Sequence, residues 1–293
     1  MESYKFKKII FNDGFLNNST DATYIIHLEG NGRYEHIQKQ LSEYHPTNIV
    51  YILYNKGYKK SKKKSFINSS SLDLIDAFLK VFKHANKKNY NNILILEDDF
   101  IFSKEIKKKE HIDKVNDTIN NLEDINFLYL LGCIPYTQIP YDLCNYRIIS
   151  TGTHAVIYSK KNRNKTLKIN QQYIKDWDAF NNQNINRITY YIPLCYQLFP
   201  ETENSKIWCK DINNFMFIIS KHIHKVFKLF GLDNQVEPGT SIIYFLSKSI
   251  TLIVSCIFLL KISNRLIKND IIYIIIFISI IISLQPIILE KCL

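Results

Sequence analysis

The first 212 residues alternate between short apolar runs and segments whose apolar residues recur at helical spacing. Strands are predicted over residues 23–28 and 48–54, with a helix over 34–42 between them. A longer helix is predicted near 71–88, where apolar residues repeat every three or four positions. Later strands are predicted over 93–96, 127–131, 154–159 and 189–192. Strands and helices that alternate in this way indicate an α/β domain with a mainly parallel, helix-covered central sheet.

Two apolar stretches follow, over residues 242–260 and 271–289, and a polar loop separates them. Each has about the 20 residues that a bilayer core requires, so two transmembrane helices in a hairpin are expected over 241–293. Lys248, near the start of the first stretch, is expected to extend its ammonium group to the membrane interface. A pair of buried core helices is the alternative interpretation.

Residues 213–240 join the α/β domain to the predicted hairpin. Lys221, Lys225 and Lys228 share one face of a predicted helix over 215–230, and apolar residues lie near the other face. This pattern is typical of an amphipathic helix in a membrane interface. The sequence therefore predicts three parts, over 1–212, 213–240 and 241–293.

The apolar strand predicted over 93–96 ends directly on three carboxylates, Glu97, Asp98 and Asp99. Open α/β sheets bind ligands beyond the carboxyl ends of such strands. Like charges this close raise one another's pKa unless a cation lies among them, and a divalent metal ion is the usual one. The pattern favours a metal-binding pocket, and an acidic turn that faces water is the alternative.

Lysine carries most of the formal net charge of +11 and is concentrated in runs such as 56–64, 104–114 and 221–228. This balance favours anionic partners, among them nucleotide sugars and anionic lipids. The runs hold few aromatic residues, and no zinc-finger or helix-turn-helix signature is present, so nucleic acid is not expected as a partner. The six cysteines show no zinc-site or disulfide spacing.

The expected location is a membrane. Residues 1–15 lack the apolar core of a signal peptide. Together with the predicted hairpin and the absence of a disulfide framework, this favours an enzyme domain on the cytosolic side of a host intracellular membrane. Basic residues in the loop between the two stretches favour a cytosolic loop, but the basic residues of 221–228 favour a cytosolic segment before the hairpin, so the topology stays open. Abundant Lys, Asn and Ile suggest an AT-rich genome, and the composition resembles that of chains from large DNA viruses.

Several segments, in order, resemble the family 25 glycosyltransferases, the lipopolysaccharide-biosynthesis and procollagen galactosyltransferase type. The resemblance spans about residues 23–208 and is carried by Tyr24-Ile25-Ile26-His27-Leu28, Arg33-Tyr34-Glu35-His36-Ile37, Ile93 to Asp99, Thr151-Gly152-Thr153-His154-Ala155, Asp176-Trp177-Asp178 and Pro193-Leu194-Cys195-Tyr196-Gln197. It implies a GT-A fold in which an acidic motif holds a divalent metal, usually Mn²⁺, against a nucleotide sugar, with a UDP-sugar as the expected donor. The implied reaction moves a hexose to an acceptor hydroxyl of a glycan, lipid or protein.

The resemblance also implies roles for individual acids. Glu97 and Asp99 alternate along an extended segment and are expected to hold the metal, whereas Asp98 points elsewhere in the cofactor site. A hard cation takes oxygen ligands and neutralises the charge that develops on the leaving nucleotide. The implied inverting transfer needs a carboxylate base, for which Asp176 and Asp178 are candidates, with Trp177 available to stack on a sugar ring. Alternatively, Asp176 caps a helix that begins near Trp177.

Three further residues are expected in the cofactor site. Arg33 follows the first strand of the resemblance, where it would pair with a phosphate, although a surface arginine is the alternative. Gly152 would let the backbone approach the ligand. His154 would line the donor site, or it is a buried histidine whose hydrogen bonds are satisfied within the protein.

Two departures from the family pattern lie in the donor region. Only Arg33 stands where the family has several arginines, and Ser69-Ser70-Ser71 replaces a glycine-rich segment with a Ser-His pair. A degenerate GT-A domain that acts as a membrane-tethered binding or scaffold module is therefore the competing hypothesis. A metal-dependent phosphodiesterase or nuclease is a third, and it would need more His and Asp ligands than the chain offers.

Overall fold

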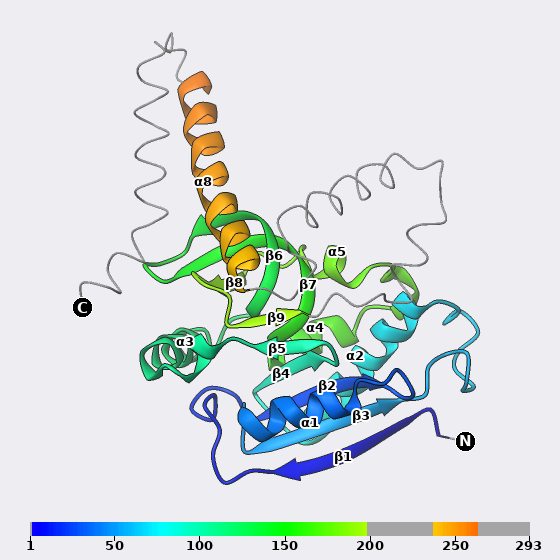
Figure 1. Cartoon of the computed structure of the whole chain (residues 1–293). Helices are drawn as coiled ribbons and strands as arrows, with labels where there is room; N and C mark the ends of the chain where they lie inside the picture. Colours follow the sequence, from blue (N-terminus) through cyan, green and yellow to red (C-terminus); the bar gives the residue numbers. More distant parts are fainter. Residues whose placement is uncertain (1, 198–236, 263–293) are drawn as a thin grey trace.

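The computed structural model describes residues 2–197 and 237–262. A seven-stranded sheet lies at its centre in the order β1-β3-β2-β4-β7-β6-β8 (Figure 1). The strands are β1 (Tyr4–Ile10), β2 (Ala22–Leu28), β3 (Ile49–Asn55), β4 (Asn92–Glu97), β6 (Leu128–Pro140), β7 (Asn145–Ser159) and β8 (Arg187–Tyr190). A separate two-stranded sheet pairs β5 (Phe100–Phe102) with β9 (Cys195–Gln197).

The seven-stranded sheet is mixed. β2 is parallel to both β3 and β4, and β1 is antiparallel at the edge. β7 runs antiparallel to β4, β6 and β8, whereas β6 and β8 are parallel. The α/β class is thus confirmed, and the predicted parallel order holds for β3-β2-β4 but not across β7. The reason is that β6 returns directly into β7, and a short connection joins antiparallel strands only.

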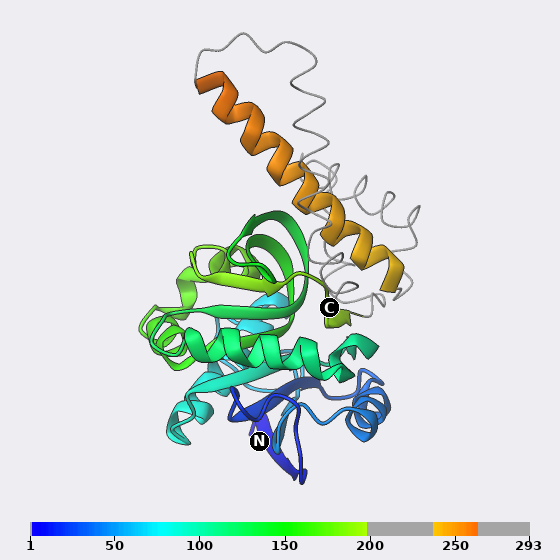
Figure 2. The same cartoon turned by 90° about the vertical axis from the view of Figure 1, so that its left-hand side faces the viewer.

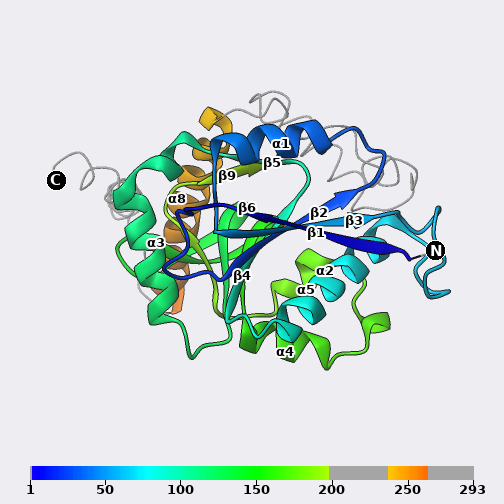
Figure 3. The same ribbon diagram turned by 90° about the horizontal axis from the view of Figure 1, so that it is seen from below.

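Helices cover both faces of the sheet (Figure 3). α1 (Tyr34–Glu43) lies on one face, and α2 (Ser70–Lys87), α4 (Lys160–Leu167) and α5 (Trp177–Asn181) lie on the other. The chain between β5 and β6 forms η1 (Lys104–Lys107) and α3 (Lys109–Asn121), and η2 (Gln171–Tyr173) precedes α5. Because both faces are covered, Ile93–Leu96 of β4 are completely buried, as their uniform aliphatic run predicts.

β6 and β7 form one long antiparallel arm that is paired from Leu128↔Tyr158 to Pro140↔Tyr146. Three register shifts interrupt the pairing, and one of them lies between Pro135 and Thr137. At Gly132 the backbone of β6 comes so close to β9 that a Cβ would lie 1.7 Å from the Cys195 carbonyl oxygen. Gly132 therefore allows β9 to cross beside the sheet, which brings the end of β9 to the acids that follow β4.

The helix that we expected as the first membrane span is α8 (Glu237–Ile262), and it packs on β6 at one end of the molecule (Figures 1 and 2). Polar side chains make this contact. Gln138 of β6 donates from Nε2 to the Tyr244 carbonyl at 2.7 Å and to Ser247 Oγ at 2.6 Å. Lys248 Nζ is buried and donates to the Tyr191 carbonyl at 2.6 Å.

Within residues 2–197 and 237–262, no helix combines the length and the hydropathy needed to cross a membrane. The expected membrane-anchored localisation is therefore wrong for the described part of the chain. Ser247, Lys248 and Ser249 are buried in the protein, so Lys248 does not extend to a membrane interface. The second predicted span, over 271–289, and the predicted amphipathic helix over 215–230 lie outside the described residues.

Replacing Lys248 tests how α8 is held. Burial lowers the pKa of Lys248 to about 7, because the charged ammonium loses hydration. The stability penalty of the charged form is therefore absent at high pH and grows as the pH falls from about 10 to about 7. We expect Lys248→Met to raise the free energy of unfolding by about 2 kcal/mol at pH 7 and by much less at about pH 10, as measured by urea unfolding. An equal effect at both pH values would contradict this account of Lys248.

Candidate functional site

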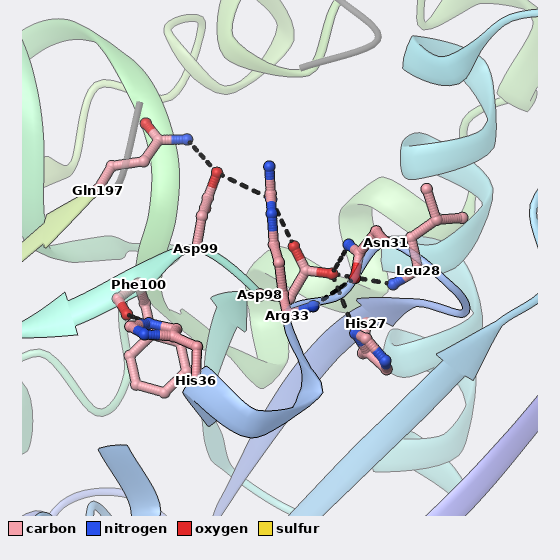
Figure 4. Close-up of polar contacts among 9 residues, drawn as sticks. All are labelled: His27, Leu28, Asn31, Arg33, His36, Asp98, Asp99, Phe100 and Gln197. Carbon is pink, nitrogen blue, oxygen red and sulfur yellow. Dashed lines mark hydrogen bonds and ion pairs between the residues drawn. The ribbon is translucent and has the colours of Figure 1, made fainter. Parts of the chain in front are cut away.

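The three consecutive acids lie where β4 ends. β4 stops at Glu97, and a turn formed by Asp98 and Asp99 leads into β5. Two other strands bring residues to this turn. β7 places Ala155 opposite Leu96, so residues 151–154 lie beside the acids, and β9 pairs Gln197 with Phe100. The loop that follows β2 lies on the remaining side (Figure 4).

Asp98 is buried and holds the loop after β2 (Figure 4). Its Oδ2 accepts from Asn31 Nδ2 at 2.6 Å, from the Leu28 N–H at 3.0 Å and from His27 Nδ1 at 3.1 Å. Its Oδ1 accepts from Arg33 Nη1 at 2.7 Å. Burial alone would raise the pKa of Asp98, but the hydrogen bond from His27, the charge of Arg33 and the other two hydrogen bonds bring it below its ordinary value. Asp98 is thus an ionised carboxylate whose two oxygens are both engaged by the loop.

Asp99 is 3% exposed, and its two oxygens differ. Oδ2 accepts from Gln197 Nε2 at 3.2 Å and from Arg33 Nη1 at 3.3 Å, whereas Oδ1 is buried without a hydrogen-bond partner. Burial, opposed by the charge of Arg33 and reinforced by that of Asp98, raises the pKa of Asp99 to about 6. Asp99 therefore keeps one acceptor oxygen that the protein leaves unsatisfied.

Glu97 belongs to a wider cluster of negative charge. It is partly buried, and its Oε1 accepts from the Thr153 hydroxyl at 3.3 Å. Burial first, and then the charges of Asp99, Asp178 and Asp98, raise the pKa of Glu97 well above its ordinary value. The influence of Asp178 means that α5 delivers a fourth carboxylate to the end of β4.

The two aspartates beside Trp177 differ in position. Asp176 is exposed and caps α5, because its Oδ1 accepts from the Ala179 N–H at 2.7 Å. Asp178 faces the cluster, and its Oδ2 accepts from the Thr151 hydroxyl at 2.7 Å and from the Gly152 N–H at 3.1 Å. Asp178 Oδ1 is buried without a partner. The structure thus confirms the capping alternative for Asp176, and of the two aspartates only Asp178 has a buried oxygen without a hydrogen-bond partner.

Trp177 is not available to a ligand. The side chain is 5% exposed, and its Nε1 donates to the Tyr158 hydroxyl at 3.1 Å. Its ring stacks with Phe78, at 4.7 Å between centroids, and with Phe180, at 5.7 Å. The prediction that Trp177 stacks on a sugar ring is therefore wrong, because the protein core already occupies its faces.

His154 is buried and keeps one nitrogen unengaged. Its Nε2 lies 3.3 Å from the Cys195 carbonyl and donates to it, so Nδ1 is the acceptor, and Nδ1 is buried without a partner. Burial lowers the pKa of His154 to about 4, so the ring is neutral at pH 7. Gly152 has a φ of +83°, and a Cβ there would lie 3.4 Å from His154 Nδ1. Glycine at this position thus keeps the space next to that nitrogen open.

The residues that hold the acids were missed in the sequence. They are His27, Asn31, Thr151, Thr153 and Gln197. All except Asn31 lie in segments that carry the family resemblance, which is the one signal that points to them. A neutral side chain within a strand has no pattern of its own, and only the pairing of β7 with β4 and of β9 with β5 reveals its role.

The side-chain atoms of the site that could act as metal ligands fit a divalent cation only in part. Asp99 and Asp178 each have a buried oxygen that no protein group satisfies, and hard cations prefer such carboxylate oxygens. In the ranges 2–197 and 237–262, no group of three or more His, Cys, Asp or Glu side chains is arranged to hold a metal ion. Magnesium-type sites often use one or two carboxylates and take the other ligands from substrate phosphates and water. The residues therefore suit an ion that arrives with a phosphorylated substrate.

Comparison with known proteins gives distant matches only. No protein-family model and no curated protein sequence matches the chain. Among similar solved structures, A197 from STIV is 14% identical over 61% of this chain and 86% of its own, with a TM-score of 0.36. A glycosyltransferase involved in the glycosylation of the major capsid of PBCV-1 is 11% identical over 63% of this chain and 95% of its own, with a TM-score of 0.38. At this identity and TM-score, neither likeness assigns a function to the chain.

Removing the charge of Asp98 should loosen the loop after β2. We expect Asp98→Asn to lower the free energy of unfolding by about 3 kcal/mol at pH 7, because Arg33 and three other donors lose an ionised partner. A carboxylate with a lowered pKa stabilises the fold above its ordinary pKa, and this contribution is lost as the pH falls through the folded value. The difference from wild type should therefore shrink at about pH 3, as urea unfolding at the two pH values would measure. Equal stability at pH 7 would rule out this role for Asp98.

Removing the charge of Asp99 should have the opposite effect. A carboxylate with a raised pKa destabilises the fold when it is ionised, so the penalty is absent below about pH 4 and complete well above its folded pKa of about 6. We expect Asp99→Asn to raise the free energy of unfolding by about 2 kcal/mol at pH 8 in a chelating buffer, and to have little effect at about pH 4. Asp98→Asn is the matched control with the opposite sign. A loss of stability in Asp99→Asn at pH 8 would contradict this interpretation.

Proposed function

We propose that the protein transfers a hexose from a nucleotide sugar, with a UDP-sugar as the expected donor, to an acceptor hydroxyl, with inversion at the anomeric carbon. The observation that carries the proposal is the cluster of Glu97, Asp99 and Asp178, in which two buried carboxylate oxygens have no partner. Uncompensated buried acids destabilise a fold, so such a cluster indicates a functional site. The resemblance of six sequence segments to family 25 glycosyltransferases supports this reaction.

Glu97 and Asp99 would hold a divalent metal such as Mn²⁺. When bound, the metal would neutralise charge on the departing nucleotide diphosphate. Arg33 lies against Asp98 and Asp99, and its side chain is 20% exposed, so its remaining N–H groups can donate to a phosphate. The neutral His154 can accept a hydrogen bond at Nδ1 from a sugar hydroxyl or from water. These groups form the donor side of the proposed site.

Asp178 is the proposed base on the acceptor side. Thr151 and Gly152 fix its Oδ2, which leaves Oδ1 to accept a proton. The acceptor oxygen attacks the anomeric carbon, and the bond from that carbon to the diphosphate oxygen breaks. The electron pair of that bond leaves with the nucleotide, and the proton of the acceptor hydroxyl passes to Asp178 Oδ1. Asp176 is engaged as a helix cap, so we assign the base role to Asp178 alone.

The test measures nucleotide release by the full chain with a panel of nucleotide sugars, and donor binding by isothermal titration with Mn²⁺ or with a chelator. Asp178→Asn should lower kcat at least about 100-fold, because a general base is lost, while donor affinity stays within about twofold. Asp99→Asn should remove the Mn²⁺-dependent part of donor binding. Asp176→Asn is the matched control, because asparagine also caps helices, and its activity should equal that of wild type.

Each outcome separates the alternatives. Activity that falls in Asp176→Asn and persists in Asp178→Asn would move the base to Asp176. Donor binding without turnover in wild type would favour a binding module over an enzyme. A folded wild-type chain that binds no nucleotide sugar, with or without Mn²⁺, would refute the proposed function.

A further inference from the structure

Tyr136 is an exposed aromatic residue next to the proposed base. Its side chain on β6 is 56% exposed. β6 pairs Pro135 with Ser150 and Thr137 with Ile149, so Tyr136 is the extra residue of a β-bulge. Bulges redirect side chains and are frequent beside active sites. The bulge in β6 thus gives the Tyr136 side chain a direction that it would not have in a regular strand.

A short chain of contacts connects this ring to Asp178. Tyr136 lies within side-chain hydrogen-bonding reach of Thr151, and the Thr151 hydroxyl donates to Asp178 Oδ2 at 2.7 Å. Partial burial raises the pKa of Tyr136, and the charges of Asp178 and Asp176 add to the rise, which also indicates that both carboxylates are close. One threonine therefore separates the exposed ring from the carboxylate that has a buried, unpartnered oxygen.

Next to Tyr136, the exposed face of β7 carries an aliphatic side chain, Ile149. Ile149 and Thr151 alternate with the buried Ile148 and Ser150, so they lie on the same face, and the Ile149 side chain is largely exposed. An exposed aromatic ring and an aliphatic side chain next to a carboxylate suit a ligand with one apolar face and hydroxyl groups around its edge. A pyranose ring has this shape, because its axial C–H bonds form the apolar face.

We propose that Tyr136 is the platform on which a pyranose ring of a saccharide acceptor stacks, so that a hydroxyl of the ring reaches Asp178 Oδ1. The inference rests on the proposed function for the reaction of that hydroxyl, and it selects a saccharide from the three acceptor classes. It also gives Thr151 a positioning role, because its hydroxyl orients Asp178 beside the Tyr136 ring. Binding of the sugar to the ring does not itself require the nucleotide donor.

The experiment measures binding of methyl glycosides of glucose, galactose and mannose to the full chain by saturation-transfer NMR, without donor. Wild type should bind at least one of them with a Kd in the millimolar range. Saturation of the protein's aromatic protons should then be transferred to the bound sugar. Tyr136→Ala should weaken that binding about tenfold, whereas Tyr136→Phe, which keeps the ring, should stay within about twofold. Tyr173→Ala is the matched control, because Tyr173 is 80% exposed in η2 and makes no contact with Asp178 or Thr151 that the structure records.

A second readout uses turnover. With the glycoside that binds best as acceptor, Tyr136→Ala should raise the acceptor KM about tenfold while the affinity for the donor is unchanged. Glycoside binding that depends on Tyr136 in a chain that binds no nucleotide sugar would support the platform and refute the transferase. Donor turnover with glycoside binding and acceptor KM equal in wild type and Tyr136→Ala would refute the platform alone. A wild type that binds none of the three glycosides, as expected for a protein or lipid acceptor, would also refute it.

Discussion

The buried, ionised carboxylate of Asp98 is the interaction on which the site depends. Burial disfavours its charge, and the charge persists only because Arg33, His27, Asn31 and a backbone N–H all donate to it. Those donors come from the end of β2 and the loop after it, so a single carboxylate fixes the path of that loop. The same arrangement places Arg33 against Asp99. Asp98 therefore holds Arg33 in the position from which it contacts both carboxylates.

Three consecutive acids thus acquire three different properties from their surroundings. Asp98 is held ionised, whereas burial and neighbouring negative charges raise the pKa of both Asp99 and Glu97. The free-energy cost of these buried charges is offset by the packing of the core, in the aliphatic strands and in the aromatic residues around Trp177. One acid thus orders the loop, whereas the other two lie beside it with raised pKa values, a combination that is frequent at functional sites.

The long β6–β7 arm joins the acids to the rest of the molecule. Its antiparallel pairing with β4 delivers Thr151, Gly152 and His154, and its bulge presents Tyr136. α8 also packs on this arm, where Gln138 of β6 donates to the Tyr244 carbonyl. Sequence reasoning placed short strands at 127–131 and 154–159 and so missed most of this arm, because the connecting residues mix polar, aromatic and proline positions that show no clean alternation. Sequence reasoning also placed Lys248 at a membrane interface. A hydropathy profile measures the apolar length of a segment, and it does not show that Lys248 is buried and donates to the Tyr191 carbonyl.

The sequence by itself determined the α/β class, the strands β2, β3 and β4, the helices α1 and α2, and the arrival of three acids at a strand end. These features follow from local periodicity and from the burial that a uniform aliphatic run requires, so no tertiary information is needed. Tertiary structure alone decided that Asp178 and not Asp176 faces the acids, that Trp177 is core and Tyr136 is exposed, and that Gln197 reaches Asp99. Each of these depends on how strands and helices from different parts of the chain pack together, and such packing leaves no trace in the spacing of residues along a single segment.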